Sequence, residues 1–538
     1  MLIKEQNAIR KSWSPDKVKI GLIYPNTYRV GMTSLGVQLL YFLFNDWENF
    51  VCERIFKPLD PKTEPYSLEN QKKLKDFDIL AISCQFEHDY IEAINLLFRG
   101  DINPDARLRK ENEPLVIVGG PSPTTNPFAV LFLADAFFLG DIEPVAEKIR
   151  TALERDNKSD QLEALTQIQG IMALKYHYNM NGEWIGNRVE RVKIQDLSNS
   201  FHPIKQIIPE DVKGTKNEPI FGKAFYLETD RGCSERCLFC FIGHCHFPRV
   251  GRSLECLTKI VDQASEVNDF EKVVIYGSAI AQSGILEALL EHITNKGYEV
   301  SCSSFRADYI TENLLKILRI GRQKTIALAP ETGYEKLRFA LNKKIKDETL
   351  LSSVKLVWDT GFRQLKLYMI YGFPCEEEYV RNANVKFLKD IREKSFPKGR
   401  ISISMNQFIT KANTPFQFSK MISIKESKDN QNWYKKEFYQ LRNVYLSLYN
   451  PEWAVIQRVL SLRNHQYFPI AKEVGIIGNT IGNWKKILKA NYIKFSEESE
   501  WNYKIQDSLP WDNIDYVLKK KNLISSHKRF QEIMDCKE

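Results

Sequence analysis

Cysteine is scarce outside the middle of this sequence. Only Cys52 and Cys84 precede residue 233, and only Cys536 lies beyond residue 420. Ten cysteines distributed in this way over 538 residues do not resemble the dense disulfide framework of a small secreted protein. The thiols are therefore expected to be reduced, which favours a cytoplasmic location.

Long apolar runs are also missing. The most apolar stretch, residues 128–138, is too short to span a bilayer and contains Asp135. The N-terminus carries charges where a signal peptide needs an apolar core. We therefore expect no membrane span.

No strong excess of one charge is present. The formal net charge of +8 is modest for this length and does not by itself indicate nucleic acid. Residues 421–538 hold 19 Lys or Arg against 14 Asp or Glu. A solvated lysine-rich surface is the simpler interpretation of this excess.

With 43% hydrophobic and 27% charged residues, the chain has the composition of a globular protein with two or three domains. In residues 1–155, apolar strands alternate with helical patterns, which predicts an α/β domain with a parallel, flavodoxin-like sheet of about five strands. Ligands of such sheets bind at the carboxyl ends of the strands. The predicted strands are 19–24, 50–55, 77–84, 115–118 and 136–139.

Residues 156–222 are interpreted as a connector. Residues 171–193 predict a hairpin that turns at Asn181-Gly182. Pro203, Pro209 and Pro219 then indicate a linker that leads into the next domain.

From residue 223 to 420, six strand-then-helix units predict a partial (βα)6 barrel, whose active site is expected at the carboxyl ends of its strands. Residues 421–538 read as mostly helical, and they contain five of the nine tryptophans, which we expect to be mainly core. The predicted barrel strands are 224–229, 272–276, 299–303, 325–329, 364–370 and 401–405.

Cys233, Cys237 and Cys240 follow the first barrel strand on a loop that begins with glycine. Three thiolates at this spacing can hold an iron-sulfur cube and leave its fourth iron without a protein ligand. A structural zinc site is the alternative, with its fourth ligand drawn from residues 244–246, and unrelated buried thiols are another. Zinc sites more often use two separated pairs of ligands, which disfavours the zinc alternative.

This CxxxCxxC spacing, with Phe239 before the last cysteine, resembles the radical SAM superfamily. The resemblance implies an enzyme in which a 4Fe-4S cluster binds S-adenosylmethionine and cleaves it to a 5′-deoxyadenosyl radical. It also implies a low-potential electron donor such as ferredoxin or flavodoxin.

Further positions resemble the same core and imply cofactor contacts. Glu331 and Gly333 follow the fourth strand where the family contacts the ribose, and Gly372 begins a turn that borders the adenine. Arg306 is a candidate partner for a carboxylate. The second strand leads into Gly277-Ser278-Ala279 where the family has Gly-Gly-Glu, so contact with the methionyl amino group is expected from backbone at Gly277.

The N-terminal loops resemble a cobalamin-binding domain. Asn26, Tyr28 and Gly31 have the spacing of the family's Asp-x-His-x-x-Gly, and Gly119-Gly120 matches its paired glycines. The histidine that would ligate cobalt is replaced by tyrosine, so any cobalamin is expected to bind without a protein nitrogen ligand. The paired glycines also suit any tight strand-to-helix turn, so the fold is better supported than the ligand.

The cysteine count implies a single cluster. Methylthiotransferases of this layout need three further cysteines in the N-terminal domain, and enzymes with auxiliary clusters place several after the barrel. Cys245, Cys256, Cys302 and Cys375 are expected to be buried small hydrophobes.

Residues 24–32 and 509–515 resemble an uncharacterised branch of radical SAM proteins with a cobalamin-domain-like N-terminus. Three hypotheses follow. The first is hydrogen abstraction, with or without cobalamin-dependent methylation of an unactivated carbon. The second is a cobalamin-independent radical SAM enzyme that modifies RNA or another anionic substrate, with small molecules and lipids also open. The third is a non-catalytic iron-sulfur or zinc protein.

Overall fold

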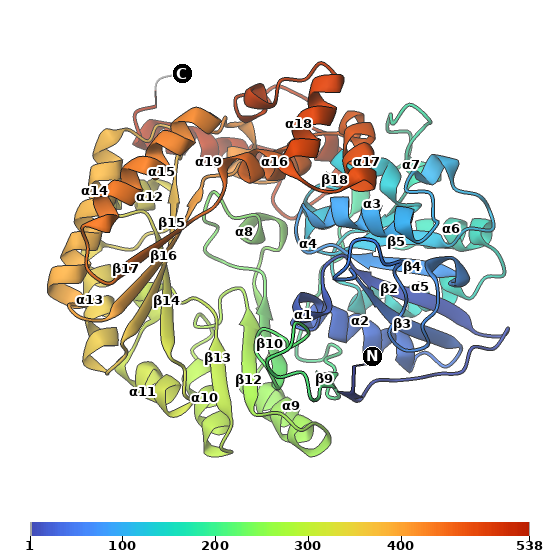
Figure 1. Cartoon of the computed structure of the whole chain (residues 1–538), viewed down its shortest axis with the longest axis horizontal. Helices are drawn as coiled ribbons and strands as arrows, with labels where there is room; N and C mark the ends of the chain where they lie inside the picture. The colour runs from blue at the N-terminus through green and yellow to red at the C-terminus, as the bar shows by residue number, and fades with distance from the viewer. Residues whose placement is uncertain (1–2, 537–538) are drawn as a thin grey trace.

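The computed structural model describes residues 3–536. Figure 1 shows the N-terminal part on one side and the middle of the chain on the other, while the C-terminal segment crosses above both. The two halves face each other, so the loops of one can meet the loops of the other.

The N-terminal part is built on one six-stranded sheet of order β3-β2-β4-β5-β6-β7. The predicted five-stranded parallel sheet is confirmed, and a sixth strand, β7, adds antiparallel to β6. Strand β2 is apolar almost throughout because helices cover both faces of a parallel sheet. The strands are β2 Val18–Tyr24, β3 Phe50–Phe56, β4 Ile79–Ser83, β5 Leu115–Gly119, β6 Ala136–Phe138 and β7 Ile171–Ala173. The main helices are α2 Leu35–Asp46, α3 Asp89–Arg99, α5 Ala146–Leu153 and α6 Lys158–Thr166.

The hairpin predicted in residues 171–193 is confirmed only near its turn. The chain reverses at Asn181-Gly182, Tyr178 bridges Trp184, and the Ile185 amide donates to the His177 carbonyl at 2.9 Å. The longer arms are wrong, because residues 171–173 pair with β6 and Leu174–His177 form the short helix α7. The edge of the N-terminal sheet thus takes the first arm, while the turn forms where its residues predict it.

The middle of the chain is an open half-barrel. Its strands form two four-stranded sheets, β11-β10-β12-β13 and β14-β15-β16-β17, which a parallel bridge between Phe305 and Leu328 connects. All six predicted strands are confirmed, and β17 Val444–Leu448 adds a seventh parallel strand from the C-terminal segment. The strands are β10 Ala224–Arg231, β11 Val250–Gly251, β12 Lys272–Gly277, β13 Glu299–Cys302, β14 Thr325–Glu331, β15 Gln364–Tyr371 and β16 Arg400–Gln407. The helices are α8 Ile242–Cys245, α9 Leu254–Val267, α10 Leu286–Asn295, α11 Glu312–Ile320, α12 Glu335–Ala340, α13 Asp347–Asp359 and α14 Glu378–Asp390.

The C-terminal segment is mostly helical, as predicted, and it joins the two halves. Helix α17 packs on α3 of the N-terminal part, and α19 packs on α12 of the half-barrel. Trp484 and Trp511 are buried, which confirms their expected role as core. No helix within residues 3–536 is both long and apolar enough to cross a bilayer. The elements are α15 Ile424–Tyr439, α16 Pro451–Leu462, α17 Phe468–Ile477, α18 Ile481–Ala490, β18 Ile514–Asp515 and α19 Lys520–Ile533.

Candidate functional site

The three cysteines of the motif lie on a loop, residues 232–240, that we call the cysteine loop. It leaves the carboxyl end of β10 at Gly232, which has a φ of +75° and whose hypothetical Cβ would lie 2.0 Å from the carbonyl oxygen of His246. No other residue type fits there, so the glycine sets the direction of the loop. Inside the loop, the amide of Cys240 donates to the carbonyl of Cys237 at 3.0 Å.

The thiols of the cysteine loop are partly buried. Burial raises the pKa of all three thiols, and that of Cys237 to about 12, so without a metal they are held as neutral thiols. Backbone amides of Ile242 and Gly243 donate toward the sulfur of Cys240 and that of Glu235 toward the sulfur of Cys233, and these bonds favour the thiolate. Three cysteines on one short loop are a ligand set for an iron-sulfur cube with one iron left open.

Each histidine considered as a fourth zinc ligand has one ring nitrogen in a contact, while His244 Nδ1 and His246 Nε2 have no hydrogen-bond partner among the residues that the structure describes. The His244 ring contacts the carbonyl of Cys237 at 3.2 Å, and an Arg191 nitrogen lies 3.0 Å from Nδ1 of His246. Cys245 is buried. Within the described part of the chain, no three His, Cys, Asp or Glu side chains are grouped so that they could hold one metal ion.

The predicted residues at the barrel's carboxyl edge lie around the cysteine loop. Arg306 forms ion pairs with Glu235 of that loop at 2.9 Å and with Asp308 at 2.8 Å. Glu331 is buried, has a φ of +65° and pairs with Lys343, with 2.6 Å between Oε1 and Nζ. This arrangement brings cations and carboxylates together beside the thiols.

The three predicted glycines differ in what requires them. Gly333 is closed in by α14, since a Cβ there would lie 2.7 Å from the Cβ of Phe387, so packing alone explains it. Gly372 has a φ of +77°, and its amide donates to the Glu376 carboxylate at 2.6 Å. Gly277 ends β12, where a Cβ would lie 2.5 Å from an oxygen of Asp230.

A cavity of about 670 Å³ extends from the N-terminal sheet to the cysteine loop. Its apolar end lies between the sheet and helices α2, α5 and α6, and is lined by Ile20, Ile79, Ile117, Leu39, Ile149 and Leu165. Its other end is lined by Gly119, Gly120, Arg231, Gly232, Tyr276 and Gly277. One space therefore reaches both the carboxyl edge of the first sheet and the residue before Cys233.

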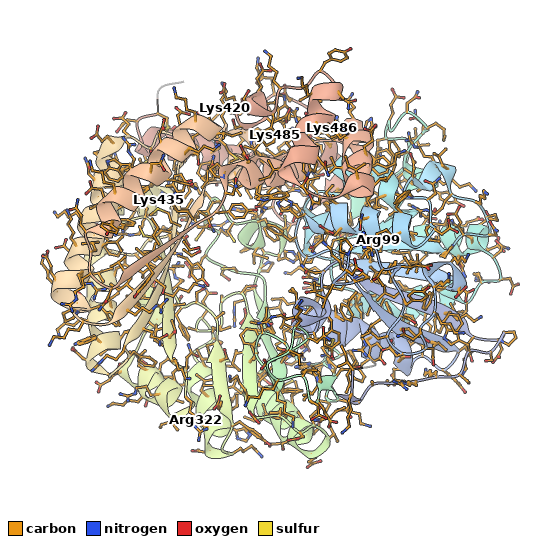
Figure 2. The ribbon with its side chains drawn as sticks, viewed as in Figure 1. Arg99, Arg322, Lys420, Lys435, Lys485 and Lys486 are labelled. Carbon is orange, nitrogen blue, oxygen red and sulfur yellow. A yellow bond between two sulfur atoms is a disulfide. The ribbon has the colours of Figure 1, made fainter. Side chains whose placement is uncertain are left out.

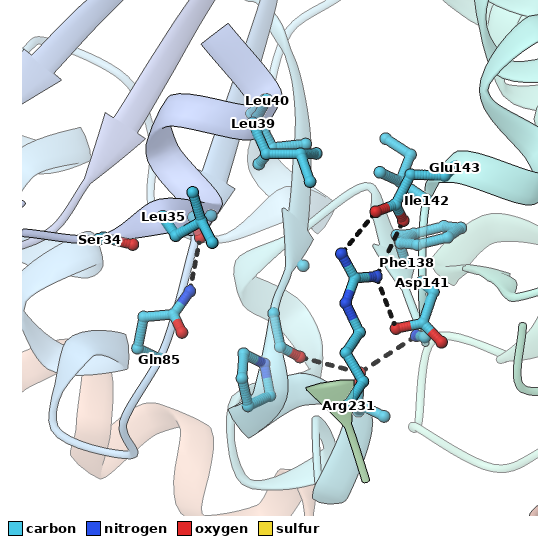
Figure 3. Close-up of a pocket in the computed structure, with 18 of the residues that line it drawn as sticks. Ser34, Leu35, Leu39, Leu40, Gln85, Phe138, Asp141, Ile142, Glu143 and Arg231 are labelled. Carbon is cyan, nitrogen blue, oxygen red and sulfur yellow. Dashed lines mark hydrogen bonds and ion pairs between the residues drawn. The ribbon is translucent and has the colours of Figure 1, made fainter. Parts of the chain in front are cut away.

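Charged side chains line this cavity where the N-terminal part meets the half-barrel. Figure 3 shows the Arg231 guanidinium directed at Asp141 and Glu143, with nitrogen–oxygen distances of 3.3 Å and 2.5 Å. Arg231 also pairs with Glu228 at 2.6 Å. Arg231 thus fixes the end of β10, and with it the cysteine loop, against the N-terminal part.

Glycines 36 and 119 of the cavity wall would each tolerate a Cβ. A Cβ on Gly119 would lie 3.7 Å from Phe138, and one on Gly36 would lie 3.6 Å from Gln85, both ordinary van der Waals contacts. Gly120 differs, since its φ is +113° and its Cβ would lie 2.4 Å from the carbonyl oxygen of Cys84. The protein's own packing therefore demands glycine at 120 but not at 119 or 36.

The first loop, residues 26–31, does not line this cavity. The Tyr28 hydroxyl donates to Glu5 at 2.7 Å, and Glu5 also pairs with the buried Arg54 at 2.6 Å. A Cβ on Gly31 would lie 2.2 Å from the Phe56 ring. The Asn26 side chain accepts a local bond from the amide of Thr27, and its backbone carbonyl accepts one from the amide of Lys57. The structure thus separates Asn26, Tyr28 and Gly31 from Gly119 and Gly120.

One sequence expectation about cysteine is wrong. Cys375 is not a free buried thiol but is bonded to Cys536. The pairing joins residues 161 positions apart, so no local pattern could have indicated it. Distance in sequence likewise hid the ion pair of Arg231 with Glu143, whose residues are 88 positions apart.

Two parts of the chain match known families. Residues 36–173 match the family described as radical SAM proteins, N-terminal, and residues 227–383 match the radical SAM superfamily. An uncharacterised protein of Methanocaldococcus jannaschii is 28% identical over 403 residues, which cover 74% of this chain and 79% of that protein.

Two solved enzymes have a similar fold. The radical S-adenosylmethionine methyltransferase TsrM from Kitasatospora setae, solved with cobalamin and a [4Fe-4S] cluster, has a TM-score of 0.51 at 12% identity, covering 88% of this chain and 100% of its own. The cobalamin-dependent S-adenosylmethionine radical enzyme OxsB, solved with aqua-cobalamin and S-adenosylmethionine, has a TM-score of 0.50 at 15% identity, covering 97% and 79%. At these identities the likeness concerns the fold.

Proposed function

We propose a function from the premise that this chain belongs to the radical SAM superfamily and is a radical SAM enzyme. In the proposal, Cys233, Cys237 and Cys240 hold a 4Fe-4S cluster. When bound, the cluster and S-adenosylmethionine supply a 5′-deoxyadenosyl radical that abstracts hydrogen from the substrate. The hypothesis of a non-catalytic iron-sulfur or zinc protein is set aside by the family membership.

We further propose that the cavity binds cobalamin, which supplies a methyl carrier for an unactivated carbon. The observation that carries this proposal is the continuity of the cavity of about 670 Å³ from the first sheet to the cysteine loop. Its apolar end suits a planar base, and Gly36 and Gly119, which the chain's own packing does not require to be glycine, line it. TsrM and OxsB, whose folds are similar, were solved with cobalamin.

The chain's own residues have positioning tasks in this proposal. Glu331, held by Lys343, faces the ribose, and backbone at Gly277 receives the methionyl amino group. Arg306 binds the methionyl carboxylate while Glu235 fixes its guanidinium at 2.9 Å. The turn at Gly372, closed by Glu376, borders the adenine. Gly333, enclosed by α14, only shapes this edge.

Cellular setting and domain limits are part of the same proposal. We assign residues 1–155, 156–222, 223–420 and 421–538 to the N-terminal domain, the connector, the radical SAM core and the C-terminal region. The enzyme would work in the cytoplasm with a low-potential donor such as ferredoxin or flavodoxin. The strand pattern supports the domain limits, and the need of the cluster for electrons supports the donor.

A second candidate is a cobalamin-independent enzyme acting on RNA or another anionic substrate. It is favoured by cations on the outer face of the C-terminal region, where Figure 2 labels Lys420, Lys435, Lys485 and Lys486. Lys485 pairs with Glu452, and Lys519 and Lys520 pair with Asp515 and Asp512. An RNA substrate predicts binding that weakens steeply with salt, and a Lys435→Ala/Lys486→Ala protein with a shallower slope.

Anaerobic reconstitution tests both candidates. About four irons and four sulfides per chain and formation of 5′-deoxyadenosine are expected for either one. Retained cobalamin supports the first candidate, and its absence together with salt-sensitive RNA binding supports the second. Intact S-adenosylmethionine after reduction of a fully loaded cluster would contradict both.

A further inference from the structure

The structure contains a covalent link that the proposed reaction does not use. Cys375 and Cys536 form a disulfide whose Cα atoms lie 5.4 Å apart and which closes 161 residues of chain. The other eight cysteines are free. A chain whose central thiols must be reduced to hold iron thus also holds one oxidised pair.

Cys375 belongs to the turn at the carboxyl end of β15. It follows Gly372, Phe373 and Pro374, and the carboxylate of the next residue, Glu376, accepts the amides of Gly372 and Phe373 at 2.6 Å and 3.0 Å. This hydrogen bonding makes the turn compact. A change at Cys375 is therefore transmitted directly to the backbone that the proposed function places beside the adenine.

Cys536 lies just beyond α19, and α19 shares an apolar cluster with the cysteine loop. Phe530 and Met534 are buried in one apolar cluster with Leu238 and Phe373. Leu238 stands between Cys237 and Cys240, and its amide donates to the carbonyl of Leu341 at 3.0 Å. The disulfide therefore joins two segments that both pack against the cysteine loop.

The disulfide is within reach of a reductant, because Cys375 and Cys536 are both partly exposed. In a reducing compartment, an accessible disulfide is open to attack by a thiolate through a mixed disulfide. A buried structural disulfide would lack this access.

We propose that Cys375 and Cys536 are a reversible thiol–disulfide exchange site whose partner is a dithiol. In the exchange, the S–S bond breaks, the two cysteines gain two electrons and two protons, and the dithiol is oxidised to its own disulfide. The oxidised pair fastens the end of α19 over the cysteine loop, and the reduced pair releases it. The exchange site stands on the disulfide alone, whereas its effect on a cluster rests on the proposed function.

Reduction of the disulfide changes how often the end of α19 opens, and it does not change the fold. Phe530 is fully buried and Leu523 and Met534 are nearly so, and these contacts hold α19 in place without the bond. The reduced chain therefore keeps its helix, but the terminal turn and the cysteine loop open more often. Amide hydrogen exchange measures this opening without any cofactor.

The test is hydrogen exchange of the full chain, without iron, before and after treatment with dithiothreitol. We expect exchange in residues 520–534 and 237–241 to become about tenfold faster on reduction, and to return on reoxidation. The Cys536→Ser and Cys375→Ser proteins should each show the fast rate without dithiothreitol. The Cys302→Ser protein, which lacks an unrelated free thiol, should behave like the parent chain.

Two results would overturn the proposal. One is alkylation of both Cys375 and Cys536 in the oxidised chain, which would mean that the bond does not form. The other is the same exchange rate in both redox states, which would mean that the bond does not restrain α19. Because neither measurement uses cluster or S-adenosylmethionine, a failure here differs from a failure of the proposed function.

Discussion

Replacing Gly119 and Gly120 one at a time by alanine separates ligand binding from folding. The two residues are adjacent at the end of β5, and both line the cavity. Each variant adds one methyl group, so the pair is matched in chemistry. Only the surroundings of the new Cβ differ.

The Gly120→Ala protein is expected to lose stability. At a φ of +113° and a ψ of −178°, the backbone is in a region that is essentially restricted to glycine, which costs an alanine about 1–3 kcal/mol. The new Cβ would also lie 2.4 Å from the carbonyl oxygen of Cys84, so that strand end must move. Urea denaturation should show a loss of at least about 2 kcal/mol.

The Gly119→Ala protein is expected to fold normally and to bind cobalamin poorly. Its Cβ would lie 3.7 Å from Phe138, an ordinary van der Waals contact, so stability should stay within about 0.5 kcal/mol of the parent. Overpacking an occupied site by a methyl group costs about 1–3 kcal/mol. Titration with hydroxocobalamin should then show affinity reduced by roughly 5-fold to 150-fold.

The reasoning is refuted if Gly119→Ala binds cobalamin as the parent does while Gly120→Ala unfolds. In that case Gly120 serves only the turn, and Gly119 has no part in binding cobalamin. Binding by the parent chain itself is the control.

Three further outcomes are expected. The Cys237→Ala protein should lose its cluster and all cleavage of S-adenosylmethionine, whereas Cys302→Ala should keep both, as iron content and 5′-deoxyadenosine formation will report. The Tyr28→Phe protein loses the bond to Glu5 and about 1.5–3 kcal/mol of stability in urea denaturation, but its cobalt(II) spectrum should not change, because Tyr28 does not line the cavity. Burial raises the pKa of Glu376 from 4.5 to about 7. The neutral carboxyl therefore contributes to the free energy of unfolding below pH 4.5, and this contribution is lost as the pH rises through 7. The Glu376→Gln protein should lack this part of the pH dependence in urea denaturation.

The strands could be predicted because each is a local apolar run between turn residues. Residues 19–24 and 364–370, for example, became β2 and β15 with small changes at their ends. The cysteine loop could equally be predicted from the sequence, since its three thiols lie within eight residues. Local signals of this kind do not depend on the rest of the chain.

The cavity could not be predicted, because its walls come from distant segments. Arg231 meets Glu143 across 88 residues, and the disulfide spans 161. The first loop resembled a cofactor loop by spacing, but the side chain of Tyr28 is held by Glu5 in a buried ionic network. Spacing specifies the backbone of such a loop, whereas the direction of its side chains depends on partners elsewhere in the sequence.

Anomalous diffraction at the iron and cobalt edges, from crystals of chain reconstituted with iron, sulfide, S-adenosylmethionine and cobalamin, tests the central claim most directly. The account predicts iron bound by Cys233, Cys237 and Cys240, and cobalt in the cavity between Gly119 and the cysteine loop. Iron at these cysteines with no cobalt in the cavity, or with cobalt outside it, would contradict the cobalamin assignment. Iron bound elsewhere would contradict the account as a whole.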